Sequence, residues 1–271
     1  MKLIRYFKFF DYYLKIFAER LSGKSKGNPY HNGEYKVLEN VIKRIKFDEP
    51  FILIDGGANT GDYSLKANEI SKKYNKKSII LAVECHAPTI KLMKENLKNI
   101  NYQLINRGLG ESNKKVIFYS DAKNPTSGQN SNIKHFYLNS KKKIQQITID
   151  KLLKTKKIKH VNFLKLDIEG FEYKALLGAK QSAKNGCIDY IQIEYNQTWI
   201  KAGATIEKIL LLSKKYNFDL FRIKHKSLLR IEKYSYILED YVFSNLLMVK
   251  KGIKLPLPCK RTAIPDFFNE V

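Results

Sequence analysis

The chain has 271 residues, of which 44% are hydrophobic, and its 50 basic and 26 acidic side chains give a net charge of +24. This length and hydrophobic content are enough for one α/β domain with a full core and an N-terminal extension. No run of 18 apolar residues occurs, which excludes a typical membrane-spanning helix.

The positive charge has two interpretations. It could serve an anionic partner, such as nucleic acid, an acidic glycan or a membrane surface. It could also reflect composition, because only seven of the 50 basic residues are arginine, the residue that readers of phosphates and base edges favour. We favour the compositional interpretation, with moderate attraction to acidic surfaces expected under both.

The first expected element is an amphipathic helix within residues 3–21. Charged residues interrupt its apolar positions, so it is not a signal peptide. We expect it to pack on protein, either this chain or a second copy in a homodimer. Weak association with an anionic membrane, at its inner face, ranks second. The apolar stripe comprises Leu3, Phe7, Phe10, Leu14, Phe17 and Leu21.

Strand-like and helix-like patterns alternate along the rest of the chain, which predicts a mainly parallel sheet with helices on its faces. The polar segment 120–143 is expected to be a long loop that serves as a lid. We expect an N-terminal helical extension and linker over 1–46, one domain over 47–252 and a tail over 253–271. The expected strands are 51–55, 79–84, 102–105, 161–167 and 188–194, followed by an antiparallel pair, 218–223 and 241–249. The expected helices are 34–46, 62–74, 88–99, 170–183 and 204–216.

The most informative segment is the glycine-rich turn after the first strand. Glycines allow a positive φ and a close approach of a ligand to the main chain. The turn lacks the spacing of dinucleotide-binding and P-loop motifs. An acidic residue at its start favours an amine-bearing ligand, such as the methionine end of S-adenosylmethionine. The candidate ligand-binding residues are Asp55, Gly56, Gly57, Asn59 and Gly61.

The ends of the next two strands supply further candidates. Glu84 closes a buried strand, where a carboxylate can accept hydrogen bonds from both ribose hydroxyls of a nucleoside. Cys85 follows it, next to the expected cofactor. Asn106 and Gly108 follow the third strand, where they could contact the adenine ring and allow its close approach.

The fourth and fifth strands end in carboxylates. Asp167 and Glu169 flank Ile168, and they converge if the strand conformation continues to residue 169. Glu194 ends the neighbouring strand and should lie near Asp167. Lys165 shares the face of Asp167 and should keep it ionised. We expect these four residues to form the catalytic group.

Together, Asp55-Gly56-Gly57-Ala58-Asn59-Thr60-Gly61, Val83-Glu84, Glu95-Asn96-Leu97 and Lys165-Leu166-Asp167-Ile168-Glu169-Gly170 resemble the FkbM family of methyltransferases, over roughly residues 50–250. The family usually has proline where Cys85 stands. The resemblance implies a class I Rossmann-like methyltransferase fold with a seven-stranded, mainly parallel sheet. It also implies S-adenosylmethionine as cofactor and a saccharide, glycolipid or related small-molecule hydroxyl as acceptor.

Two alternatives remain open. An RNA 2′-O-methyltransferase would use a lysine–aspartate–lysine–glutamate set, for which Lys36 or Lys43, Asp167, Lys180 and Glu194 are candidates. The other alternative is a noncatalytic glycan- or membrane-associated module that retains the fold. We rank nucleic acid below a saccharide as partner.

The five histidines and three cysteines are scattered without the spacing of metal ligands, so no metal site is expected. Unpaired cysteines fit a reducing cytoplasm. Two histidines could still act near the site: His86, which follows the second strand, and His135, which lies in the expected lid.

Overall fold

The computed structural model describes residues 27–123, 130–133 and 138–261. The expected helix at 3–21, and with it the predicted packing or membrane contact, lies outside these ranges, as does His135. Within the described ranges, no helix combines the length and the apolar character needed to cross a membrane.

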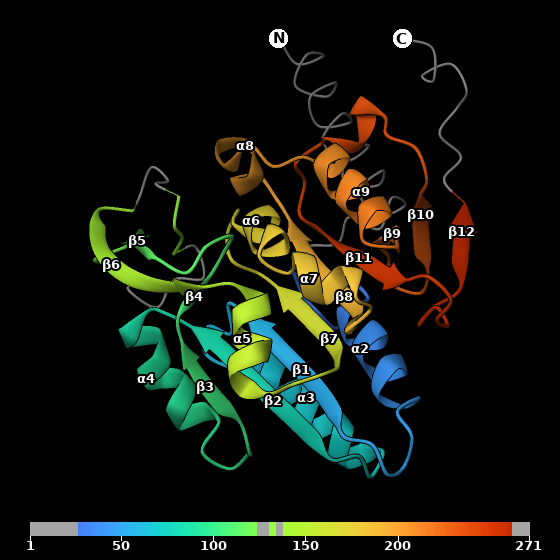
Figure 1. Cartoon of the computed structure of the whole chain (residues 1–271), viewed down its shortest axis with the longest axis horizontal. Coiled ribbons are helices and arrows are strands. Elements are labelled where there is room, and N and C mark those ends of the chain that lie inside the picture. Colours follow the sequence, from blue (N-terminus) through green and yellow to red (C-terminus); the bar gives the residue numbers. More distant parts are fainter. Residues whose placement is uncertain (1–26, 124–129, 134–137, 262–271) are drawn as a thin grey trace, which may run out of the picture.

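A mixed sheet runs through the middle of the molecule (Figure 1). The five central parallel strands are joined by an antiparallel strand, β11, that lies between β8 and β9. This arrangement confirms the predicted fold class. In order across the sheet the strands are β12 (Cys259–Arg261), β10 (Leu228–Ile231), β9 (Phe218–Ile223), β11 (Ser244–Lys250), β8 (Ile188–Tyr195), β7 (Val161–Leu166), β1 (Phe51–Gly56), β2 (Ser78–Glu84) and β3 (Gln103–Asn106).

The sheet is larger than the seven strands predicted. In the described part of the chain it has nine strands, because β10 and β12 extend it beyond β9. The polar segment 224–240, expected to be a plain connection, contains β10 and the short 3₁₀ helix Tyr236–Leu238.

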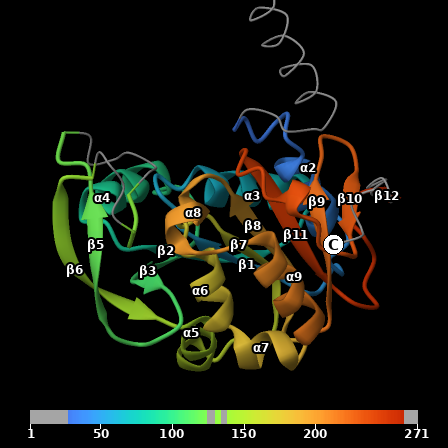
Figure 2. The same ribbon diagram turned by 90° about the horizontal axis from the view of Figure 1, so that it is seen from above.

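Both faces of the central strands are buried, which is why their sequences are continuously apolar. Leu53 and Phe163 face a core completed by α2 (Glu34–Ile42) and α3 (Asp62–Lys73). Ile54 and Leu164 face the opposite core (Figure 2). That core is completed by α5 (Ile149–Lys156), α6 (Glu172–Leu177), α7 (Lys180–Lys184), α8 (Thr198–Ala202) and α9 (Ile206–Lys215). The helix α4 (Ala87–Asn96) follows β2.

The single helix expected over 170–183 is wrong, because α6 and α7 are separate helices with a break at Gly178 and Ala179. A side chain at Gly178 would have its Cβ 2.1 Å from the carbonyl oxygen of Gly110, so the chain approaches another loop closely there. The carbonyl of Gly178 accepts a hydrogen bond from the main-chain N–H of Asp150 at the start of α5.

The expected loop 120–143 is wrong at its two ends, where Ser120 ends β5 (Lys115–Ser120) and residues 140–143 begin β6 (Ser140–Ile147); the described residues between them form no named helix or strand. A second, three-stranded sheet is formed by β4 (Gly108–Leu109), β6 and β5. We call the antiparallel pair β5 and β6 the β5–β6 arm. Its second strand was missed because three consecutive lysines replace the apolar alternation that identifies a strand.

Candidate functional site

Two clefts meet at the carboxyl ends of β1, β2, β7 and β8. The β5-side cleft has a volume of about 560 Å³ and extends from the glycine loop past Glu84 to Phe118 of the β5–β6 arm. The α2-side cleft has a volume of about 630 Å³ and extends from the same loop to Tyr35 of α2. Gly57, Asn59 and Asp167 line both clefts. A ligand that filled both would therefore pass over the glycine loop.

The glycines of the loop are needed mainly for packing within the chain. Gly57 has φ +77°, and a Cβ there would lie 1.8 Å from the carbonyl oxygen of Asp167. Gly61 has φ +90°, and its Cβ would lie 2.8 Å from the Leu97 side chain. At both positions the space is filled by the protein, rather than kept open for a ligand as the sequence suggested. Gly56 and Gly61 are not among the residues that line the clefts.

Asp55 lies beneath the loop and lines neither cleft. One carboxylate oxygen accepts a hydrogen bond of 2.7 Å from the Ser64 hydroxyl, and the other has no hydrogen-bond partner. Burial raises the pKa of Asp55, although the nearby Lys165 ammonium opposes this shift. Since Asp55 lines neither cleft, it could reach a ligand amine in either cleft only through an intervening group.

Glu84 lines the β5-side cleft, as predicted, but its carboxylate is already well used. One oxygen accepts the N–H groups of Cys85 and His86, and the other accepts the N–H of Asn59 at 3.0 Å. A carboxylate offers about four acceptor positions. Glu84 therefore has room for about one further hydrogen bond. The sequence had suggested that it accepts hydrogen bonds from both ribose hydroxyls.

At the end of β3, the cleft-lining residues differ from those expected. Arg107 and Gly108 line the β5-side cleft, together with Cys85. Asn106 is exposed and is not among the lining residues. Arg107 was not predicted, because the amino group of adenine is a donor and an acidic or amide oxygen was expected to accept from it.

The β5-side cleft fits a nucleoside in its chemistry. Val83, Leu109 and Phe118 supply apolar walls, and Glu84 retains one acceptor position for a hydroxyl. Ligand sites of this kind combine apolar walls with a few placed polar groups. Phe118 was missed because residues 115–120 were not predicted to form a strand.

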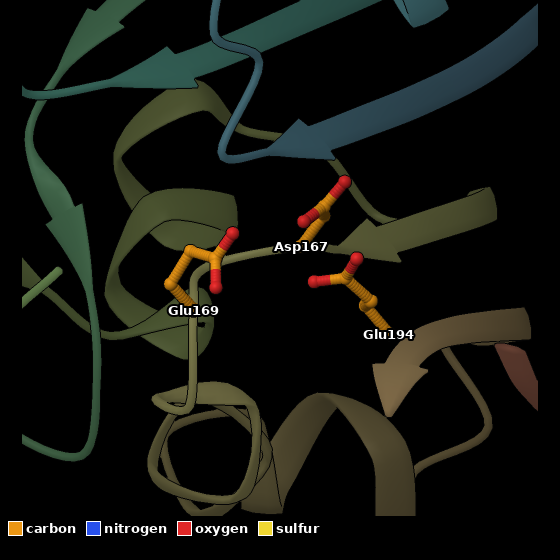
Figure 3. Close-up of side chains that lie close together, drawn as sticks. All are labelled: Asp167, Glu169 and Glu194. Atoms are coloured by element: carbon orange, nitrogen blue, oxygen red, sulfur yellow. The ribbon is translucent and has the colours of Figure 1, made fainter. Parts of the chain in front are cut away.

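The catalytic candidates gather where the two clefts meet. Asp167, Glu169 and Glu194 each place a carboxylate oxygen within 4.8 Å of the other two. Figure 3 shows the three side chains pointing toward one another from the end of β7, the following turn and the end of β8. The predicted proximity of Glu194 to Asp167 thus occurs in the structure.

The convergence of Asp167 and Glu169 has a different origin from the one expected. The strand β7 ends at Leu166, and Glu169 has φ +53°, in the left-handed region. Such a conformation costs about 1–3 kcal/mol for a residue with a side chain, and it concentrates at functional sites. A strained turn, rather than strand alternation, directs Glu169 into the cluster.

Lys165 supplies the only cation in direct contact with this cluster among the described residues. Its ammonium donates to Asp167 at 2.7 Å and is buried beneath the site. Burial opposes the charge of Lys165, but Asp167, Asp55 and Glu34 outweigh it and raise its pKa. Burial also opposes ionisation of Asp167, yet the Lys165 ammonium holds the pKa of that carboxyl below its usual range. The predicted role of Lys165 in keeping Asp167 ionised agrees with this geometry.

The other two carboxyls behave in the opposite way. Burial, followed by the charges of Asp167 and Glu172, raises the pKa of Glu169 to about 8. Burial and the same Asp167 charge raise the pKa of Glu194 well above its usual range, and Glu194 also shares a hydrogen bond with Asp167. At neutral pH the cluster therefore combines an ionised Asp167 with a Glu169 that largely retains its proton, beside Glu194, whose pKa is also raised.

Three clustered carboxylates could also coordinate a divalent cation, since oxygen ligands suit Mg²⁺ and Ca²⁺. No metal was expected here from the sequence, because the three residues come from two separate segments without the spacing of metal ligands. In the structure the Lys165 ammonium already neutralises Asp167.

The α2-side cleft brings together residues that sequence analysis did not connect. Its lining includes the aromatic rings of Tyr35, Tyr63 and Phe243 beside Glu194. Beneath it lies the buried carboxyl of Glu34, which accepts hydrogen bonds of 2.8 Å from both Gln192 and Asn245. A buried acidic residue on an apolar helix face was the available signal for Glu34.

The sheet order, with β11 reversed, and the cleft at the carboxyl ends of its strands define a class I methyltransferase fold. The family comparison makes the assignment more specific, because residues 55–220 match the family model described as Methyltransferase FkbM domain. The match covers more than half of the chain, which therefore belongs to the FkbM methyltransferase family. No curated protein is similar enough in sequence to count as a match.

Several solved structures are similar to this chain. An FkbM methyltransferase from Methylobacillus flagellatus has 15% identity and a TM-score of 0.48, over 88% of this chain and 60% of that one. A putative RNA methyltransferase from Pyrococcus horikoshii has 13% identity and a TM-score of 0.40, over 80% and 83%. A SAH-bound methyltransferase from Podospora anserina has 10% identity and a TM-score of 0.43, over 84% and 81%. The chain thus spans 60% of the length of the Methylobacillus protein.

Proposed function

We propose that this FkbM-family protein is an S-adenosylmethionine-dependent O-methyltransferase that acts on a hydroxyl of a saccharide, glycolipid or related natural product. Family membership supports methyl transfer with this cofactor. The observation that carries the O-methyl proposal is the carboxylate cluster at the junction of the two clefts. A hydroxyl must lose its proton as it attacks, and a carboxylate within reach can accept that proton.

The β5-side cleft would hold the nucleoside end of the cofactor, with Glu84 at a ribose hydroxyl and Leu109 and Phe118 against the base. Its methionine end would extend over Gly57 and Asn59, which line both clefts. When bound, the cofactor supplies an electrophilic methyl group. The protein contributes mainly alignment, which can remove several kcal/mol from a barrier.

Glu169 is the preferred general base, in place of Asp167, which the sequence favoured. Asp167 is bound to Lys165 and has a lowered pKa, so it accepts a proton poorly. The pKa of Glu169 is about 8, close to the value that suits a base at neutral pH. Glu194, hydrogen-bonded to Asp167, would orient the acceptor hydroxyl.

The acceptor would enter through the α2-side cleft. Aromatic rings at Tyr35, Tyr63 and Phe243 offer flat apolar surfaces, and Asp62 and Glu194 offer carboxylates. A saccharide presents both apolar C–H faces and hydroxyl donors, so this combination suits it.

The test is to incubate the full-length protein with methyl-tritiated S-adenosylmethionine and separate saccharide, glycolipid, RNA and protein fractions. We expect label in a saccharide or glycolipid fraction that survives mild alkali, because methyl ethers survive it and methyl esters do not. The matched control is Glu169→Gln, which should bind the cofactor but transfer little label. Ribonuclease-sensitive label would instead support the RNA alternative, and cofactor binding without transfer to any fraction would support a noncatalytic module.

A further inference from the structure

The β5–β6 arm is unusually basic even for this chain. Segments 112–120 and 138–147, which contain its two strands, carry five lysines and no acidic residue. All five are exposed, and none forms an ion pair with another described residue. Some exposed lysines elsewhere, such as Lys73 and Lys98, pair with glutamates. The five are Lys114, Lys115, Lys141, Lys142 and Lys143.

The strand register places three of these lysines, Lys115, Lys141 and Lys143, on one face of the arm and Lys142 on the other. Lys141 lies opposite Tyr119 and Lys143 opposite Ile117, so these four side chains share the outer face of the arm. Residues two apart on a strand are separated by about 7 Å. Like charges at this spacing repel one another. Ile117 is 45% exposed between them, an apolar group that also lacks cover.

The inner face of the arm belongs to the site. Phe118, opposite Lys142, lines the β5-side cleft, and its ring lies 5.7 Å from that of His86. Ser131, which bridges to β5, donates a hydrogen bond of 2.6 Å to the carbonyl oxygen of Glu169. Figure 1 shows the arm standing beside the carboxyl ends of the strands, on the β3 side of the sheet. The arm thus borders the β5-side cleft through its inner face, while Lys115, Lys141 and Lys143 on its outer face are exposed.

We infer that the β5–β6 arm is a docking surface for an anionic saccharide chain, one that carries carboxylate or phosphate groups. This inference rests on the proposed function, because it defines the charge class of the same enzyme's acceptor. A row of anions would neutralise the outer-face lysines, and Ile117 and Tyr119 would contact the sugar rings between the anionic groups.

A saccharide suits the arm better than RNA does. Proteins that bind single-stranded nucleic acid combine basic grooves with several aromatic platforms and often with arginine. The two segments contain no arginine, and Tyr119, partly buried, is the single aromatic residue on the outer face of the described arm.

The experiment compares two triple variants of the full chain that remove equal charge. K115Q/K141Q/K143Q changes the three lysines on the outer face of the arm, whereas K154Q/K156Q/K159Q changes exposed lysines at the end of α5 and in the segment before β7. The latter segment leads into the amino end of β7, on the opposite edge of the sheet from the clefts. Binding is measured by fluorescence anisotropy with labelled octagalacturonate, linear polyphosphate, dextran and octauridylate.

We expect the arm variant to bind octagalacturonate or polyphosphate at least tenfold more weakly than the parent, and the α5 variant to stay within twofold. High salt should reduce this difference, since exposed charges are screened. Tighter binding of octagalacturonate would identify carboxylate as the group recognised, and tighter binding of polyphosphate would identify phosphate. Dextran should not bind.

Equal weakening by both triples would overturn the inference, since net charge alone would then explain binding. So would unchanged binding in the arm variant, or tighter binding of octauridylate than of either other anion. Cofactor affinity and methyl transfer to the extract fractions are measured on the same variants. If the arm fails this test while transfer to a neutral saccharide persists, the docking inference falls and the proposed function stands.

Discussion

The two halves of the site differ in how their charged and polar groups are balanced. On the glycine-loop side, polar groups are largely satisfied by the chain: Glu84 accepts three main-chain N–H groups, and the carbonyl of Asp167 occupies the space beside Gly57. On the carboxylate side, three acidic groups share one contacting lysine among the described residues. In the first half, hydrogen bonds within the chain hold the polar groups in place. In the second half, burial and mutual repulsion raise the pKa values of Glu169 and Glu194. The comparison predicts that substitutions in the two halves affect different measurements.

The largest expected effect is on the carboxylate side. Glu169→Gln removes the proposed base while keeping the shape of the side chain. Turnover should fall by roughly 10²–10⁴, the usual contribution of a general base, while cofactor affinity changes by no more than a few-fold. The measurements are initial rates of methyl transfer and calorimetry with S-adenosylmethionine.

The pH profile provides the control for this prediction. In the parent protein, turnover should rise with pH through a midpoint near 8, where Glu169 is half ionised, and level off above it. Asp167→Asn removes a negative charge that raises the pKa of Glu169, so its profile should shift to lower pH. If Asp167→Asn abolishes turnover at every pH and Glu169→Gln does not, Asp167 is the base.

On the loop side, Gly57→Ala is expected to act on stability and binding. Its Cβ would lie 1.8 Å from the Asp167 carbonyl oxygen, and φ +77° is unfavourable for alanine. We expect a loss of about 2–3 kcal/mol in the free energy of unfolding, measured by urea denaturation. Gly203→Ala is the matched control, because Gly203 also has a positive φ but no atom lies within 4 Å of its Cβ. Equal losses in both variants would show that backbone strain, rather than contact with Asp167, sets the cost.

The sequence predicted the residues of the carboxylate half better than those of the loop half. Lys165, Asp167, Glu169 and Glu194 come together in the structure, whereas Asp55, Gly56 and Gly61 line neither cleft. Central parallel strands are continuously apolar and end in polar residues, so Asp55 and Glu84 could be placed at strand ends. The proximity of Glu194 to Asp167 could also be predicted, because β7 and β8 were expected to be neighbours. What a glycine makes room for is a tertiary property: no pattern in the sequence indicates that Gly57 faces a carbonyl and Gly61 faces Leu97.

The missed parts share the same cause. Glu169 reaches the cluster through a left-handed turn that local patterns do not encode. The strand β6 lacks apolar alternation because its lysines face solvent, and Phe118 could not be assigned to the cleft without it. Arg107 and Tyr35 were missed because the segment after β3 and the helix α2 come beside the clefts only in the folded chain.

A smaller effect is expected on stability as a function of pH. Burial raises the pKa of Glu169 and Glu172 to about 8, against a usual value of 4.5. The folded state thus holds more protons than the unfolded state between these values. The contribution of these two groups to stability is therefore fully present below about pH 4.5 and is lost as pH rises to about 8. We expect Tm to fall by about 5 °C between pH 5.5 and 8.5, measured by calorimetry. Glu172→Gln should flatten this dependence, because glutamine has no proton to lose. The fold should survive the change, since the amide oxygen can still accept the N–H groups of Ile168 and Gly170. A Tm that rises across this range would show that the two glutamates are ionised in the folded protein.

The smallest expected effect tests whether the carboxylate side needs a metal. Lys165 already supplies a positive charge 2.7 Å from Asp167, and the raised pKa values of Glu169 and Glu194 leave protons where a cation would otherwise be required. We therefore expect excess chelator to change turnover by less than twofold. The control is the same assay with added Mg²⁺, which should neither stimulate the chelated enzyme nor raise its Tm. A loss of activity that Mg²⁺ restores, together with a Tm increase that Glu194→Gln abolishes, would mean that the three carboxylates bind a cation and that Glu169 is a ligand rather than a base.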